Sequence, residues 1–234
     1  MTNPSTDAHR LDLGRSERLG LPEAVYCAGK TVQQCVDIVA SFLANSEDAV
    51  IATRATDEQQ AALDELAPDA HVGPTLTWRH RASTGRSASV VSAGTSDLAV
   101  ADEVRLVLTA MGHEANALTD VGVAGLHRLT DALPEIMAND IVVALAGFEG
   151  ALPTVLAGLI PHPIIAIPTS VGYGTAFEGM TALHSMMASC APGITLVGID
   201  NGYGAACAAH RFLSTINRTA TNPTGTNPTG TNPA

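Results

Sequence analysis

The feature that most constrains this chain is a series of short, wholly apolar segments that alternate with helical segments from residue 88 onward. Residues 140–147 read DIVVALAG, and residues 162–170 read HPIIAIPTS. Strands that are apolar on both faces are typical of parallel sheets covered by helices on both sides. The sequence therefore predicts an α/β domain with a parallel sheet and right-handed crossovers.

A smaller unit precedes this domain. Residues 24–27 and 49–55 read as strands, and residues 31–45 and 57–66 read as helices, the first of them capped by Thr31. The tail repeats TNPTG and lacks core-forming residues. We therefore predict a flexible arm at 1–20, a small N-terminal α/β module at 21–70, a linker at 71–87, the larger domain at 88–218 and a disordered tail at 219–234.

Composition excludes several classes of function. A formal charge of -11 argues against a nucleic-acid surface, although local donors could still bind a small anion. No segment has the roughly 18 apolar residues that span a bilayer, and no secretory signal is recognisable. The four cysteines show no CxxC spacing and the eight histidines no metal-binding spacing. We expect a cytoplasmic protein with free thiols and no metal site.

Ligands of such domains bind beyond the carboxyl ends of the strands, so the loops there form the candidate site. The first loop, Gly94-Thr95-Ser96-Asp97, joins a strand to a helix. Small residues let the main chain approach a phosphate, and the carboxylate could accept ribose hydroxyls. The alternative is that Ser96 or Asp97 only caps the helix. The loop lacks the GxGxxG pattern of dinucleotide-binding folds.

Two further loops carry charged side chains. Asp120, His127 and Arg128 flank a glycine-rich turn, where Arg can bind a phosphate and His can exchange a proton near neutral pH. A solvent-exposed turn is the alternative. Glu149 follows an aliphatic strand within AGFEG, which suits either a general base or an acid favoured by a helix N-terminus.

The last candidate region runs from 168 to 204. Gly172 and Gly174 predict a close approach of the main chain to a ligand or a neighbouring subunit. Cys190 ends a predicted helix, and a lone cysteine is usually a buried, structural thiol. As a nucleophile it would need an activator other than the helix dipole, such as a cationic ring bound in the site.

Taken together, these loops resemble one known family. The segments are AGTSDLAVADE, DVGVAGLHR, AGFEGALPTVLAGLIPHPIIAIPTSVGYG and MMASCAPGITLVGIDNGYGA, and RLGLPEAVYCAGKTVQQ resembles the family's opening. They resemble the LarB family of pyridinium-3,5-biscarboxylic acid mononucleotide synthases, which make the precursor of the nickel-pincer nucleotide cofactor. The resemblance covers roughly residues 11–218, and several long motifs in order are more specific than any single loop.

The resemblance implies a fold, an assembly and a reaction. The family's C-terminal domain is similar to aminoimidazole ribonucleotide carboxylases and mutases, which implies a flavodoxin-like three-layer fold and a homo-octamer. The implied reaction is carboxylation of the pyridinium ring of nicotinic acid adenine dinucleotide by CO2 or bicarbonate, with hydrolysis of its phosphoanhydride to release AMP. No tightly bound cofactor is implied, and the sequence leaves open whether Mg²⁺ assists the hydrolysis.

The resemblance also implies residue roles. Cys190 matches the family nucleophile and Glu149 the family base, whereas Cys207 is a competing thiol that we expect to be packed. Phe148 departs from the family, where a smaller or more flexible apolar residue is usual, and this puts the pocket shape in doubt. The positions that match the nucleotide-binding residues of the purine-synthesis relatives are Thr95, Ser96, Asp97, His127 and Arg128.

Two other functions stay open at this point. A true aminoimidazole ribonucleotide carboxylase or mutase would share the fold and the carboxylation but would need no thiol. A non-catalytic nucleotide sensor would bind a nucleotide without turnover. The expected partners are the dinucleotide, CO2 or bicarbonate and further copies of the chain, with neither nucleic acid nor a membrane.

Overall fold

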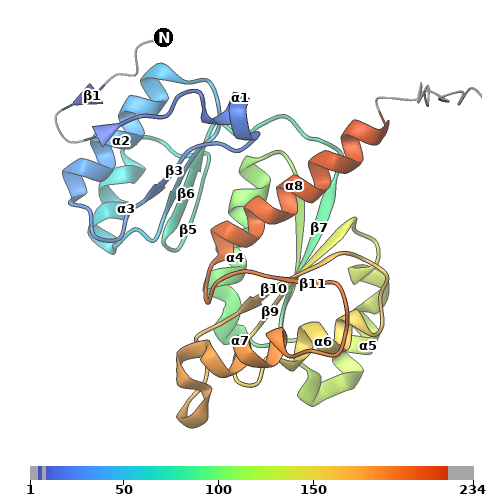
Figure 1. Cartoon of the computed structure of the whole chain (residues 1–234). Coiled ribbons are helices and arrows are strands. Elements are labelled where there is room, and N and C mark those ends of the chain that lie inside the picture. The colour runs from blue at the N-terminus through green and yellow to red at the C-terminus, as the bar shows by residue number, and fades with distance from the viewer. Residues whose placement is uncertain (1–4, 7–8, 221–234) are drawn as a thin grey trace, which may run out of the picture.

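The structure is a computed structural model that describes residues 5–6 and 9–220, with side chains described from residue 11 to residue 216. Figure 1 shows a small N-terminal α/β unit and a larger one that ends in a long helix, α8 (Gly202–Ala220). The predicted tail at 219–234 lies outside the described residues, except for its first two, which belong to α8. Among the described helices, none is long and apolar enough to cross a membrane.

The N-terminal module is built on a four-stranded sheet of order β3-β4-β6-β5, in which only β3 and β4 are parallel. As predicted, Thr31 caps the first long helix, because its hydroxyl accepts a hydrogen bond from Gln34 N at 3.2 Å. The elements are α1 (Arg15–Leu19), β3 (Ala24–Tyr26), α2 (Val32–Asn45), β4 (Val50–Thr53), α3 (Asp57–Asp64), β5 (Ala70–Val72) and β6 (Thr75–Trp78), after two short strands, β1 (Ser5–Thr6) and β2 (His9–Arg10).

The linker predicted at 71–87 is wrong over its first half, where β5 and β6 form an antiparallel hairpin. All four residues of β6 are buried. Leu76 and Trp78 pack in the module's own core, while Thr75 and Thr77 lie on the opposite face, where α4 (Leu98–Ala110) packs. The sequence does not show that a helix of the next domain covers these threonines, so it does not reveal that the segment is a buried strand.

The larger domain contains a five-stranded, wholly parallel sheet of order β11-β10-β9-β7-β8. Helices α4 and α8 cover one face, and three others cover the opposite face. This arrangement confirms the predicted flavodoxin-like α/β fold. The strands are β7 (Ser87–Ser92), β8 (Glu114–Leu118), β9 (Ile141–Ala146), β10 (Ile164–Pro168) and β11 (Ile194–Leu196), and the other helices are α5 (Leu126–Ile136), α6 (Ala151–Ala157) and α7 (Met180–Met187).

The module and the larger domain share one hydrophobic core. Leu21 and Ile51 pack in the same buried cluster as side chains of α4 and α8. Arg81 adds polar contacts at this junction, because its guanidinium donates to the Asp48 carboxylate at 2.7 and 2.8 Å and to the Ser16 hydroxyl at 2.6 Å. The flexible arm predicted at 1–20 is wrong from residue 11 onward, because Leu11 is buried and residues 15–19 form α1, although none of the residues of that helix is buried.

Candidate active site

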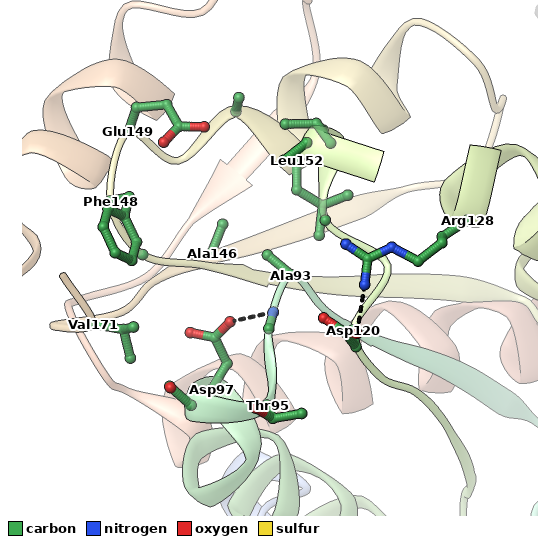
Figure 2. A pocket seen from close by; sticks show the side chains of 17 residues that line it. Ala93, Thr95, Asp97, Asp120, Arg128, Ala146, Phe148, Glu149, Leu152 and Val171 are labelled. Carbon is green, nitrogen blue, oxygen red and sulfur yellow. Dashed lines mark hydrogen bonds and ion pairs between the residues drawn. The ribbon is translucent and has the colours of Figure 1, made fainter. Parts of the chain in front are cut away.

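A cavity of about 380 Å³ lies at the carboxyl edge of the larger sheet, where the sequence predicted the site. Its walls come from the loops that follow β7, β8, β9 and β10. Figure 2 shows Glu149 and Phe148 on one side of the cavity and Asp120 with Arg128 on the other. The lining residues are Ala93, Gly94, Thr95, Ser96, Asp97, Asp120, Gly122, Val123, Ala124, Arg128, Ala146, Gly147, Phe148, Glu149, Ala151, Leu152 and Val171.

Asp97 is the buried acid of this cavity, with 2% of its surface exposed. Its carboxylate accepts hydrogen bonds from Gly94 N at 2.9 Å and from the Thr169 hydroxyl at 2.6 Å. Burial raises the pKa of Asp97 above its usual range, and these two hydrogen bonds oppose the rise. The carboxylate does not cap α4. It instead fixes the first loop and joins it to the loop after β10, while Thr95 and Ser96 remain exposed.

Arg128 is the only Lys or Arg among the residues that line the cavity. Its guanidinium donates to the Asp120 carboxylate across the turn that precedes α5. A Cβ on Gly125 would lie 2.7 Å from Arg128 Nε, so glycine there leaves room for the arginine. His127 is exposed at the start of α5 and does not line the cavity.

The loop after β9 carries Glu149 at the mouth of the cavity, where it is exposed. Phe148 N donates to Val171 O at 2.8 Å, so this loop lies against the loop after β10. A Cβ on Gly147 would lie 2.3 Å from Val171 O, which makes glycine necessary at this contact. Phe148 has φ +51° and its ring packs edge-on against Tyr173, with centroids 5.4 Å apart.

Gly172 and Gly174 do not line this cavity. They line a separate hollow of about 400 Å³ together with Tyr173, Phe177 and Glu178. Both glycines have positive φ, +142° and +57°. A Cβ on Gly172 would lie 2.6 Å from Ala176 Cβ, so the close approach seen there is within its own loop. Nothing would obstruct a Cβ on Gly174.

Cys190 is exposed and is not among the residues that line the cavity. It follows α7 and precedes β11, so it belongs to the amino edge of the sheet, whereas Glu149 follows β9 at the carboxyl edge. A single chain therefore does not bring these two residues together. Cys207 is half-buried in α8 against the shared core, and burial raises the pKa of its thiol.

Sequence reasoning overlooked Thr169, whose hydroxyl connects the buried Asp97 to the loop after β10. A polar residue directly after the apolar strand at 164–168 was the available signal. Asp200 was overlooked too, although its carboxylate accepts a hydrogen bond from Ser170 N at 2.8 Å. In the part of the chain that the structure describes, no group of three or more His, Cys, Asp or Glu side chains is arranged to hold a metal ion.

Comparison with known proteins agrees with this geometry. Residues 4–80 match the LarB/PurE-like N-terminal domain, and residues 87–224 match AIR carboxylase. An uncharacterized protein of Methanocaldococcus jannaschii is 35% identical over 215 residues, covering 86% of this chain and 82% of that protein. The N5-carboxyaminoimidazole ribonucleotide mutase of the same organism is 34% identical over 130 residues, covering 53% of this chain and 77% of the mutase. The chain belongs to the AIR carboxylase family and has the two-domain architecture of LarB.

Proposed function

We propose that this protein carboxylates the pyridinium ring of nicotinic acid adenine dinucleotide and hydrolyses its phosphoanhydride to release AMP. Membership of the AIR carboxylase family supports a carboxylase-type activity on a nucleotide. The N-terminal LarB/PurE-like domain and the resemblance of the site loops to LarB support the choice of substrate.

The observation that carries the proposal is that the Glu149 carboxylate has no hydrogen-bond or ion-pair partner among the described residues. Its carboxylate stands at the mouth of the cavity without a hydrogen bond or ion pair to any described residue. The two other acids of the cavity both accept hydrogen bonds, Asp97 from Gly94 N and the Thr169 hydroxyl and Asp120 from Arg128. A carboxylate with no internal partner is available to accept a proton from a bound substrate, which is what a general base needs.

The proposed chemistry starts from a cationic ring, which does not attack CO2 unaided. A thiolate first adds to ring carbon 4, so that the ring becomes an electron-rich dihydropyridine. Carbon 5 then uses an electron pair of this ring to form the new bond to CO2. Glu149 removes the proton from carbon 5, and the thiolate leaves with its electron pair as aromaticity returns. Water separately cleaves the phosphoanhydride and releases AMP.

Cys190 is the proposed nucleophile, and its position requires a second copy of the chain. Within one chain it belongs to the opposite edge of the sheet from Glu149. We therefore propose that Cys190 of one copy reaches the cavity of another within a homo-octamer. Exposed apolar side chains beside the cavity are consistent with a covered surface, since Tyr173 is 82% and Phe177 65% exposed. Mg²⁺ enters this proposal only as a possible aid to the hydrolytic step.

A carboxylase or mutase of purine synthesis is the second candidate. It is favoured by the 34% identity to the N5-carboxyaminoimidazole ribonucleotide mutase. That relative matches only 53% of this chain, whereas the uncharacterized protein of the same organism matches 86%. The N-terminal module therefore favours the first proposal.

Mass spectrometry separates the two candidates. The protein is incubated with ¹³C-bicarbonate and either nicotinic acid adenine dinucleotide or aminoimidazole ribonucleotide. It is also incubated with N5-carboxyaminoimidazole ribonucleotide labelled with ¹³C in its carboxyl group, because a mutase moves that group and takes up no bicarbonate. The proposal expects a labelled pyridinium dicarboxylate mononucleotide and AMP from the dinucleotide. Label in the imidazole product alone would establish the purine-type activity instead. Binding of a nucleotide without any labelled product, with and without added Mg²⁺, would identify a sensor.

A further inference from the structure

A second polar cavity, of about 260 Å³, lies between the N-terminal module and the larger domain. The chemistry proposed above makes no use of it. Ligand sites often form at such junctions between domains. The module contributes Arg15, Glu23, Tyr26 and Arg54 to its walls, and the larger domain contributes Glu103 and Asn201.

We propose that this junction cavity binds a nucleoside monophosphate, with its phosphate between Arg15 and Arg54, its ribose at Glu23 and its base against Tyr26. The choice of AMP as the nucleotide rests on the proposed function, while the rest of the inference rests on the cavity itself.

The two arginines have unused donors for a phosphate. Arg15 Nη1 lies 3.3 Å from Glu23 Oε1; its Nε is buried, but about a third of the side chain is exposed. Arg54 Nε lies 3.5 Å from Glu103 Oε1, and its Nη2 donates to Asp200 O. A guanidinium has five N–H donors, so each keeps some for an anion.

The candidate active site offers little to a phosphate by comparison. Its lining includes Asp97, Asp120 and Glu149 but only one cation, Arg128, which is paired with Asp120. The whole chain carries a formal charge of -11, so an anion must find locally concentrated cations. The junction cavity has two arginines against two carboxylates, Glu23 and Glu103, so its lining is neutral where that of the active site is acidic. Lys30 is not part of the lining, but its ammonium donates to Tyr26 O at 2.6 Å.

Two further side chains suit a nucleoside. Glu23 lines the cavity with a quarter of its side chain exposed, although its Oε2 is buried, and a carboxylate is the usual acceptor for ribose hydroxyls. Tyr26 lines the cavity and is 58% exposed, which leaves its ring free to stack on a base.

The junction cavity is also connected to the candidate active site. Arg54 holds Asp200 O, and the Asp200 carboxylate accepts from Ser170 N at 2.8 Å. The neighbouring Thr169 donates to Asp97 at 2.6 Å. A ligand that binds Arg54 would therefore affect the series of hydrogen bonds that leads to Asp97 and fixes the first loop of the active site.

Isothermal titration calorimetry on the full-length protein, with AMP as the probe, tests the inference without requiring turnover. Arg15→Gln should weaken AMP binding at least tenfold, and Tyr26→Ala should weaken it as well. Arg18→Gln is the matched control, because Arg18 lies in the same helix and pairs with Asp12 away from the cavity. It should leave the affinity within twofold. Thermal unfolding of each variant checks that the fold is retained.

Three results would overturn the inference: no binding of AMP by the wild-type protein at millimolar concentration, equal affinity in Arg15→Gln, or adenosine binding as tightly as AMP. A further titration distinguishes the source of the nucleotide. If saturating nicotinic acid adenine dinucleotide abolishes AMP binding, and Arg15→Gln weakens both ligands, the cavity holds the adenylate half of the substrate. If AMP binds unchanged beside the dinucleotide, the cavity is a separate effector site. Either result retains the cavity as a nucleotide site, whether or not carboxylation is found.

Discussion

Two acids in the loops of the candidate site have opposite surroundings. Asp97 is buried and holds two hydrogen bonds, so its main contribution is to fix the loops around it. Glu149 is exposed at the cavity mouth and engages no described residue. At the scale of single residues, this contrast separates a positioning group from a group that can exchange a proton with a substrate.

Replacing Glu149 with Gln should therefore remove the proton acceptor while keeping the shape of the loop. We expect carboxylation to fall by about 10²–10⁴-fold, the usual contribution of a general base, with substrate affinity little changed. Glu178→Gln is the control, since Glu178 is also exposed but lines the neighbouring hollow. Product formation and calorimetric binding are measured together. Turnover of Glu149→Gln within a few-fold of wild type would rule out this role.

The two cysteines of the larger domain should respond differently to replacement by Ser. Cys190→Ser should abolish carboxylation, because a hydroxyl is far less acidic than a thiol and adds poorly to a pyridinium ring. Cys207→Ser should be nearly silent, since Cys207 is half-buried and burial raises its pKa, which keeps it a neutral thiol. Turnover and the transient absorbance of a dihydropyridine report the difference. The assignment passes to Cys207 if the effects are reversed.

At the scale of elements, the apolar pattern predicted the larger sheet well. Strands β7, β9 and β10 are largely buried, so their residues had to be apolar or small, whereas the edge strand β8 buries only Leu118. The glycine-rich turns that end these strands could also be located, because the chain must turn there against a neighbouring loop. What the pattern could not show is burial supplied by another unit, and for that reason the hairpin of β5 and β6 read as a linker.

The separation of Glu149 from Cys190 was available in the sequence but was not used. One residue follows a predicted strand and the other precedes one, and parallel strands put these positions at opposite edges of a sheet. The family resemblance implied that both residues act in one reaction, but it did not take into account that they lie at opposite edges of the sheet. The position of Thr169 after an apolar strand could have singled it out, but its partner and that of Asp200 are set by tertiary contacts that the sequence does not show.

Gly147 should be the most sensitive backbone position of the site. In Gly147→Ala the new Cβ would lie 2.3 Å from Val171 O, so the loops after β9 and β10 would have to separate. We expect a loss of about 1–3 kcal/mol in the free energy of unfolding, as for other overpacked positions. Gly94→Ala is the control, because the nearest atom to its Cβ would be Asp97 Oδ2 at 3.8 Å. Urea unfolding measures both, and equal losses would contradict the reason given.

At the scale of the whole molecule, two buried histidines connect the units. His113 Nε2 lies 2.9 Å from His210 Nδ1, and the outer nitrogens lie 2.8 Å from the Thr84 hydroxyl and 3.1 Å from Gly20 O. Burial lowers the pKa of His113 to about 4 and also lowers the pKa of His210. In the folded state, His113 therefore remains neutral as the pH falls from 6.5 toward 4, and His210 takes up a proton less readily than it does in the unfolded chain.

Stability should consequently be complete above about pH 6.5 and should fall as the pH drops from there toward 4, by up to roughly 3 kcal/mol for His113. Urea unfolding at several pH values measures this slope. His113→Asn should flatten it, because the variant no longer contains the group that titrates. His184→Asn, which changes an exposed histidine of α7, should keep it. Equal slopes in both variants would show that other groups cause the acid sensitivity.

Subunit mixing tests whether two copies share one site. Glu149→Gln and Cys190→Ser should each be inactive alone. After the two variants are dissociated and reassembled together, about a quarter of the sites should contain both intact groups if these come from different copies. Recovery of activity on mixing is the expected outcome. Mixed oligomers, verified by mass, that stay inactive would mean that the two groups belong to the same copy.

The core shared between the two units also affects the order in which the parts of the protein can fold during synthesis. Leu21 and Ile51 belong to the same buried cluster as Leu213 of α8, the last helix of the described chain. During synthesis the N-terminal module and α4 leave the ribosome first, but part of this cluster stays uncovered until α8 has emerged and packs on α4. Nascent chains that stop before α8 should accordingly expose part of this apolar cluster and bind chaperones. A full-length chain should bury the cluster, and stop binding chaperones, when α8 packs on the larger domain.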